Sequence, residues 1–187
     1  MTLAMADFLQ LVFNIRKADP DDLNQLVQLS RQTFIEAFGA QNKPENIKSY
    51  MDMAFSEPQL LDELLDPDAT FFLVFAVSEE EEGPVGYAKL RSSKKQAALE
   101  GYRAMEIQRI YVLERLKGWK VGKLLMQTCL DTARQLGFEV VWLGVWEHNP
   151  SAIAFYRRWG FEQFGAYIFP FGDEDQTDLL FHKWLSD

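Results

Sequence analysis

The sequence predicts an α/β (α+β) fold with a central mixed sheet flanked by helices, and two observations support this class. Apolar segments with strand character alternate with segments of helical spacing, and in the second half a strand, a helix and another strand follow one another as in a crossover connection. No internal repeat, Ser/Pro-rich linker or shift in composition divides the 187 residues. We therefore expect one domain over residues 1–187, with 1–12 as a loosely ordered N-terminal extension.

The first half begins with a strand at 13–18 and a helix whose ends carry clear chemical markers. Asp19 suits the N-cap and Pro20 the first helical position, because a capping carboxylate accepts a backbone N–H and proline lacks one. Gly39 is a natural stop for this helix. Two further helical segments follow, at about 44–55 and at 57–65.

A hairpin is expected to follow these helices. Residues 70–78 are rich in aromatic and β-branched side chains, which is typical of a buried strand. The four glutamates at 79–82 are better explained as a solvated hairpin tip than as a charged interaction patch, and the next strand starts at Pro84. Residues 93–103 carry no clear pattern.

The second half repeats the alternation of strand and helix. A strand at 104–113 leads through a loop into a helix that ends near Leu136, and a strand at 138–147 is apolar enough to be buried on both faces. The helix carries one apolar stripe: Val121, Leu124, Leu125, Thr128, Cys129 and Leu136. Cys129 on this stripe is expected to be a packed core residue rather than a nucleophile. The chain ends with a short helix capped by Asn149 and two strands, at 161–170 and 177–185.

Charge and cysteine content argue against several classes of function. The net charge of −9 argues against binding DNA or anionic membranes through a general basic surface. The single cysteine allows no internal disulfide and fits a reducing compartment. No apolar run is long enough for a membrane span, and the first residues lack the features of a signal peptide. We expect a cytoplasmic protein that binds neither nucleic acid nor membrane.

The stretch LKGWKVGKLLM, residues 116–126, has the composition of a phosphate-binding loop. It does not fit a nucleoside-triphosphate P-loop, which has a longer spacing than Gly118 to Gly122 and a hydroxyl after the lysine. Backbone N–H groups at the start of the following helix would still form an anion site, and three lysines add positive charge. A solvated, lysine-rich helix start is the alternative.

Two motifs of the second half together resemble those of the GNAT acetyltransferase superfamily. The strand end IYVL at 110–113 precedes the loop, and NPSAIAFYRRWGF at 149–161 contains the family pattern Asn-x-x-Ala-x-x-Phe-Tyr-x-x-x-Gly-Phe. The resemblance covers about residues 13–185. It implies a mostly antiparallel mixed sheet of about seven strands, splayed between the fourth and fifth strands. It also implies that the loop holds the pyrophosphate of acetyl-coenzyme A (acetyl-CoA), without a metal.

The loop departs from this family pattern. Lys117 stands where Arg or Gln is usual and Lys120 where the first glycine is usual, whereas Gly122 matches. A side chain at 120 matters if that position needs a positive φ or if the pyrophosphate must touch a bare Cα. Since backbone donors do not depend on the side chain, we expect coenzyme A binding to survive, with weakened or retuned affinity. The cofactor contacts expected in the loop are Lys117, Gly118, Trp119, Lys120, Val121, Gly122 and Lys123.

A closer resemblance is to the PaiA-type polyamine acetyltransferases of that superfamily. It rests on QRIYVL, WLGVWEHN, FYRRWGF and the tail FGDEDQTD at 171–178, with Tyr167 standing where these proteins often have His. The resemblance implies direct transfer of an acetyl group from acetyl-CoA to a primary amine, such as that of spermidine or spermine. The expected partner is then a small-molecule amine, and the oligomeric state, monomer or homodimer, stays open.

The family pattern also suggests which residues contact the donor. Tyr156 matches the general acid near the sulfur, with core packing as the alternative. Asn149 matches a contact of the pantetheine arm, although helix capping alone would also explain this residue. The backbone groups expected to pair with pantetheine as an added strand would are those of Ile110, Tyr111 and Val112.

The base and the acceptor contacts are less narrowly defined. Glu106 matches a position that relays the proton through water, with an exposed strand-end acid as the alternative, and Glu147 is a second candidate. A polyamine presents spaced cations, so the acceptor candidates are Glu36, Glu147, Tyr167, Asp173 and Asp175, although GDED at 172–175 is also ordinary turn chemistry. Competing functions are transfer to a protein α-amine or another small amine, or a coenzyme A-binding regulatory module with little catalysis.

Overall fold

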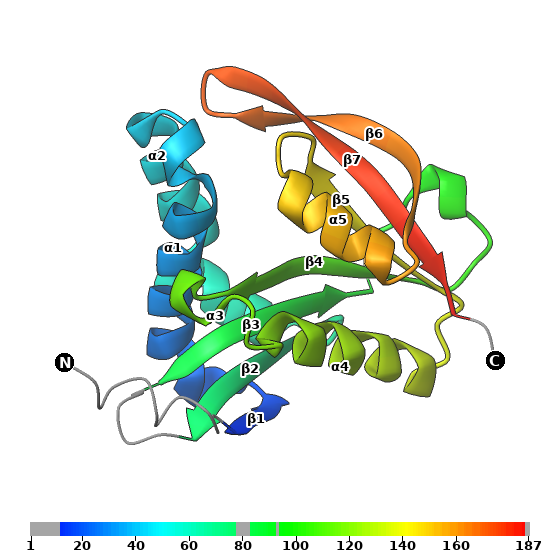
Figure 1. Ribbon diagram of the computed structural model, residues 1–187, viewed down its shortest axis with the longest axis horizontal. Coiled ribbons are helices and arrows are strands. Elements are labelled where there is room, and N and C mark those ends of the chain that lie inside the picture. The colour runs from blue at the N-terminus through cyan, green and yellow to red at the C-terminus, as the bar shows by residue number, and fades with distance from the viewer. Residues whose placement is uncertain (1–11, 78–82, 93, 186–187) are drawn as a thin grey trace.

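The computed structural model describes residues 12–77, 83–92 and 94–185, and these fold into a seven-stranded sheet with helices on both faces (Figure 1). The strands are β1 (Val12–Lys17), β2 (Ala69–Val77), β3 (Pro84–Arg91), β4 (Ala104–Val112), β5 (Val140–Trp146), β6 (Glu162–Phe171) and β7 (Glu174–Trp184). The helices are α1 (Leu23–Phe38), α2 (Pro44–Ala54), α3 (Glu57–Leu65), α4 (Val121–Gln135) and α5 (Pro150–Arg158).

The strand order is β1-β2-β3-β4-β5-β7-β6, and every neighbouring pair is antiparallel except β4 and β5. The predicted mixed, mostly antiparallel sheet is thus confirmed. Strands and helices lie close to their predicted ranges, but Val12, expected in the N-terminal extension, already belongs to β1. The rest of that extension and the glutamates at 79–82 lie outside the described residues. Among the described helices, none is both long and apolar enough to span a membrane.

The passage from β1 into α1 is fixed by a cluster of aspartates, as the capping chemistry predicts. The first turn is a 3-10 helix, η2 (Pro20–Asp22), in which Asp19 and Asp22 each accept a backbone N–H in a reciprocal capping box. Arg16 of β1 donates two hydrogen bonds of 2.7 Å to the Asp22 carboxylate. These hydrogen bonds lower the pKa of Asp22, which therefore stays ionised and holds β1 against the helix start.

Helices α1 and α3 pack against one face of the first four strands, and α4 packs against the other (Figure 1). Side chains of β3 alternate between these faces, so Lys89 reaches Glu63 of α3 at 2.8 Å whereas Gly86 faces α4. A Cβ at Gly86 would lie 3.2 Å from the Val121 side chain and 3.0 Å from the Tyr111 carbonyl oxygen. Glycine at this position lets α4 approach the sheet closely.

Helix α4 buries an apolar stripe that differs from the predicted one at its end. Leu136 was expected on the buried face, and this is wrong: the residue is 51% exposed. The reason is that α4 ends at Gln135, and Leu136 is its C-cap residue. The fully buried residues of the stripe are Val121, Leu125, Met126, Cys129, Leu130 and Ala133. Burial raises the pKa of the Cys129 thiol to about 12, as expected for a packed residue that is not a nucleophile.

The sheet splits between β4 and β5. These two strands pair only between Ala104–Glu106 and 140–142, and beyond that they diverge (Figure 1). β4 continues beside β3, with a register shift that leaves Gln108 without a partner on β3, and β5 continues beside β7. The predicted splay between the fourth and fifth strands is confirmed, and it leaves one edge of β4 unpaired.

Candidate active site

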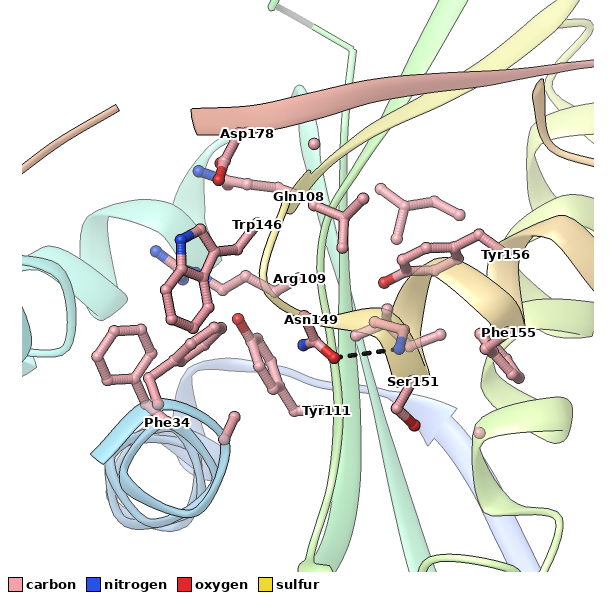
Figure 2. A pocket seen from close by; sticks show the side chains of 18 of the residues that line it. Phe34, Gln108, Arg109, Tyr111, Trp146, Asn149, Ser151, Phe155, Tyr156 and Asp178 are labelled. Carbon is pink, nitrogen blue, oxygen red and sulfur yellow. Dashed lines mark hydrogen bonds between the residues drawn. The ribbon is translucent and has the colours of Figure 1, made fainter. Parts of the chain in front are cut away.

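A cavity of about 1050 Å³ lies where β4 and β5 diverge. Side chains from both halves of the sheet and from the neighbouring helices point into this space (Figure 2). What we call the loop end of the cavity is formed by Lys117, Gly118, Lys120, Gly122 and Lys123. The opposite part, the aromatic end, is formed by Phe34, Tyr50, Trp146, Tyr167 and Phe169.

The start of α4 presents backbone N–H groups at the loop end. Lys120 is the N-cap residue, and its side chain makes no capping hydrogen bond. The first hydrogen bond of the helix runs from the Leu124 N–H to the Lys120 carbonyl oxygen, at 3.0 Å. The N–H groups of residues 121–123 therefore precede the helical ladder, at the positive end of the helix dipole. Such a helix start is a site for an anion.

Lys120 holds a left-handed backbone conformation with φ 68° and ψ 7°. Among the described residues it is the only one other than glycine with a positive φ. A side chain in this conformation crowds the backbone, whereas glycine adopts it freely. Position 120 thus does require a positive φ, which gives a physical reason for the usual glycine there.

The loop side chains divide between the cavity and the rest of the fold. Lys120, Gly122 and Lys123 line the cavity, and a Cβ at Gly122 would meet only Phe155 and Val112, at 3.8 Å or more. Lys117 also lines the cavity and forms an ion pair with Glu114. The two remaining cofactor candidates of the loop pack against the hydrophobic core instead: Trp119 and Val121.

The unpaired edge of β4 forms one wall of the cavity. Ile110, Tyr111 and Val112 line the cavity on this strand, beyond the last residue that pairs with β5. A free strand edge offers N–H and C=O groups to an extended ligand, which binds as an added strand would. The three residues thus stand where the sequence places the pantetheine contacts, and that role stays a prediction.

Helix α5 brings two further candidates to the cavity. Asn149 Oδ1 accepts the Ala152 N–H at 3.1 Å, so the residue caps α5 and also lines the cavity (Figure 2). Tyr156 is only 8% exposed, and its hydroxyl points into the cavity (Figure 2). Burial raises the pKa of Tyr156 above that of a free tyrosine, so the phenol keeps its proton at neutral pH. A neutral phenol in this place can donate a proton.

Glu106 lies at the base of the splay, at the last position where β4 pairs with β5. The Arg91 Nε and Nη2 atoms donate to Glu106 Oε2 at 2.8 and 2.6 Å. Burial raises the pKa of Glu106 even though Arg91 acts in the opposite direction. The alternative of an exposed strand-end acid does not hold, because Glu106 is 8% exposed and lines the cavity.

Rings from distant parts of the chain gather at the aromatic end. Phe34 of α1 stacks on Tyr50 of α2 with 4.7 Å between ring centroids, and Tyr50 packs edge-on against Phe169 of β6 at 6.0 Å. Phe38 of α1 reaches Trp146 of β5 at 6.0 Å. Faces of aromatic rings attract cations, so this end of the cavity suits an organic ammonium.

Two of the acceptor candidates reach the cavity. Tyr167 lies at the aromatic end, where its hydroxyl donates to Asp178 Oδ2 at 3.1 Å. Glu36 lines the cavity as well, but its carboxylate accepts the Glu114 N–H at 2.7 Å and so ties α1 to the loop before α4. Glu36 therefore has a positioning contact that the sequence did not indicate.

The other acceptor candidates lie outside the cavity. Glu147 borders a separate surface depression next to His148. Asp173 is exposed in the β6–β7 turn and pairs with Lys43 at 2.8 Å, while Asp175 is exposed on β7. The turn chemistry that the sequence offered as the alternative describes the position of Asp173 better than a place in the cavity.

Several polar residues that line the cavity were not found from the sequence, among them Gln108, Arg109 and Asp178. Arg109 is buried and donates to Glu63 at 2.6 and 3.2 Å, and Glu63 also pairs with Lys89. Burial, together with the charge of Arg109, lowers the pKa of Lys89 to about 8. The unusual charges of β3 and β4, strands that are otherwise apolar, could have drawn attention to this cluster.

Asp178 ends the tail 171–178 that supports the closer resemblance, but the sequence did not single it out, because its place in the cavity depends on how β5, β6 and β7 align. Burial raises the pKa of Asp178, and the hydrogen bond from Tyr167 opposes this shift. Among the described residues, no three His, Cys, Asp or Glu side chains gather as a metal site requires.

Comparison of the sequence with known proteins identifies relatives. A model of the acetyltransferase (GNAT) family matches residues 23–161. An uncharacterized N-acetyltransferase in the pepI 3' region of Lactobacillus delbrueckii subsp. lactis is 33% identical over 164 residues, which cover 88% of this chain and 92% of that protein. Spermidine N(1)-acetyltransferase from Thermoplasma acidophilum is 22% identical over 169 residues, covering 90% of this chain and 95% of that protein.

Solved structures share the fold over nearly the whole chain. PaiA N-acetyltransferase from Thermoplasma acidophilum, solved in complex with coenzyme A, has a TM-score of 0.75 at 23% identity, covering 92% of this chain and 99% of that chain. The ribosomal-protein-S18-alanine N-acetyltransferase from Escherichia coli has a TM-score of 0.67 at 15% identity, covering 94% and 96%. With the family model spanning most of the fold and a relative at 33% identity, this chain belongs to the acetyltransferase (GNAT) family of N-acetyltransferases.

Proposed function

We propose that this protein transfers an acetyl group from acetyl-CoA to a primary amine of a polyamine such as spermidine. Membership of the family gives the reaction type, and the class of acceptor amine is what we propose beyond it. The observation that carries this step is the aromatic end of the cavity, where aromatic rings lie together with the Asp178 carboxylate in the same cavity as Tyr156 and Glu106. The resemblance to a spermidine N(1)-acetyltransferase supports the same class.

The residues of the loop end fit the donor. Backbone N–H groups of residues 121–123 and the Lys120 and Lys123 ammonium groups would hold the pyrophosphate, and Gly122 presents a bare Cα toward the cavity. The free edge of β4 at 110–112 would hold the pantetheine arm. Asn149 lies between this edge and α5 and can contact the arm while it caps the helix.

Two side chains would handle the protons. When bound, acetyl-CoA supplies an acetyl carbon whose bond to sulfur breaks as its bond to the amine nitrogen forms. Glu106 would take the proton that the acceptor ammonium must lose, directly or through a water, and its raised pKa favours this. Tyr156, protonated at neutral pH, would donate to the departing sulfur. A coenzyme A-binding module without catalysis is less favoured, because both side chains line the same cavity.

The test is thiol release from acetyl-CoA with a panel of acceptors. We expect the highest kcat/KM with spermidine and spermine, and lower values with amino acids and with short peptides that have a free α-amine. A peptide as the best acceptor would contradict the polyamine proposal and leave the reaction type intact. Measurable coenzyme A binding without thiol release from any amine would overturn catalysis itself.

A further inference from the structure

Asp178 is the only charged residue among those of β5, β6 and β7 that line the cavity in the described structure. In the sheet register it stands opposite Trp146 of β5 on one side and Tyr167 of β6 on the other. Residues directly opposite one another on antiparallel strands point to the same face. Trp146, Asp178 and Tyr167 therefore form a row across three strands that faces the cavity (Figure 2 shows Trp146 and Asp178).

Asp178 differs from the other acids of the cavity in the partners of its carboxylate. Glu106 is paired with Arg91, and Glu36 accepts the Glu114 N–H. Among the described residues, Asp178 accepts a side-chain hydrogen bond only from the Tyr167 hydroxyl, at 3.1 Å, and no basic side chain forms an ion pair with it. A half-buried carboxylate without a cation is unfavourable, so it is a natural partner for a cation on a ligand.

The surroundings of Asp178 leave room for such a cation. Gly144 of β5 lines the cavity beside the row, and a Cβ there would lie 3.6 Å from Asp178 Oδ2 and 3.5 Å from the Tyr167 ring. Glycine thus keeps the wall next to the carboxylate bare. The rings of Trp146 and Tyr167 flank the same place, and an ammonium is attracted both by a carboxylate and by ring faces.

We propose that Asp178, oriented by Tyr167, binds a second ammonium group of the acceptor and so selects diamines and polyamines over monoamines. This inference rests on the proposed function, because it assigns the reacting amine to the part of the cavity at Tyr156 and Glu106. The acceptor would span from that centre to Asp178, with its distal cation on the carboxylate.

Binding without turnover tests the site separately from catalysis. Calorimetry in the presence of coenzyme A would compare 1,4-diaminobutane with n-butylamine, which has the same carbon chain and one ammonium fewer. We expect the wild-type protein to bind the diamine about 10–100-fold more tightly, and Asp178→Asn to remove this difference. Tyr167→Phe should reduce it partly, because the carboxylate keeps its charge and loses the group that orients it.

Kinetics with the same pair of amines give the second readout. Asp178→Asn should lower kcat/KM for the diamine about 10–100-fold more than that for n-butylamine, and circular dichroism of the variant shows that it is folded. Asp62→Asn, which removes an equal charge from an exposed position on α3, should change neither value.

Each result decides one question. Equal affinity of the wild-type protein for the two amines, or an unchanged preference in Asp178→Asn, overturns the role of Asp178, whatever the thiol-release assay shows. Preferential diamine binding that needs Asp178, with no thiol release from any amine, supports the site and overturns the proposed acetyl transfer.

Discussion

Two substitutions separate the effect of the left-handed backbone at Lys120 from the effect of its charge. Lys120→Gly and Lys120→Ala both remove the ammonium group, but only glycine relieves the backbone strain. An L-residue in the left-handed region costs about 1–2 kcal/mol relative to glycine. Lys120→Gly should therefore be more stable than Lys120→Ala by about 1 kcal/mol, or about 2–4 °C in Tm for a domain of this size. Thermal unfolding of the two variants measures this difference.

Coenzyme A binding of the same two variants tests the charge of Lys120. Both lack the ammonium, so both should bind coenzyme A about 2–5-fold more weakly than the wild-type protein, as an exposed ion pair predicts. Tighter binding by Lys120→Gly than by the wild-type protein would mean that the lysine obstructs the loop. Equal melting temperatures of the two variants would contradict the backbone strain.

Tyr156 offers a second test at the scale of one residue. Its raised pKa keeps the phenol protonated at neutral pH, so Tyr156→Phe removes a proton donor and little packing. We expect kcat to fall by about 10²-fold or more, with an unchanged KM for the amine. Tyr102→Phe, a matched change at a tyrosine outside the cavity that packs on Trp184, should keep full activity. An unaltered kcat in Tyr156→Phe would remove this residue from the acid role.

At the scale of elements, the β6–β7 turn is fastened to the start of α2. Asn46 donates to Asp173 at 2.8 Å, and Lys43 pairs with Asp173 and with Glu174. Gln176 donates to Asn42 near the same place, at 2.5 Å. These contacts join the two parts of the chain that carry Tyr50 and Phe169, and so they position the rings of the aromatic end.

Gly172 is essential to this fastening. It has a φ of 65°, and an added Cβ would overlap the Asn46 side chain, so Gly172→Ala must displace Asn46 from Asp173. Gly101→Ala is the matched control, because Gly101 also has a positive φ but no atom within 4 Å of the added Cβ. We expect Gly172→Ala to cost about 1–3 kcal/mol more than the control in urea unfolding and to raise the KM for the amine. Equal losses of stability would show that the turn is not held by Asn46.

Local chemistry predicted the ends of several elements because the residues that decide them are neighbours in sequence. Asn149 is the cap of α5 and Asp19 starts the first helical turn, as their residue types indicate. Leu136 was misplaced because helical spacing does not show where a helix stops. The residue type of Lys120 argues against a left-handed conformation, and only the glycine usual at this position in the family pattern pointed to the positive φ that the turn into α4 has.

At the scale of the whole molecule, most residues of the loop end of the cavity could be listed from the sequence, whereas at the aromatic end only Tyr167 was among the candidates. The loop, the end of β4 and the start of α5 carry contiguous motifs, so their residues could be listed together. Asp178 meets Trp146 and Tyr167 only through the register of three strands, which spacing in sequence does not give. Asp173, an acceptor candidate by residue type, instead pairs with Lys43 and so connects the β6–β7 turn with the start of α2.

The splay leads to a prediction about the stability of the whole sheet. Its two halves are joined by only three residue pairs between the described strands β4 and β5. A ligand bound along the free edge of β4 would bridge these halves. Coenzyme A at about 100 times its Kd should add about 2.7 kcal/mol to the free energy of unfolding, raising Tm by about 5–11 °C. Hydrogen exchange should slow most at 107–112 of β4, which borders the cavity, and at 121–123 of α4, whose N–H groups precede the helical ladder, and least in β1. Protection spread evenly over β1 to β3, or absent from 107–112, would contradict binding in the splay.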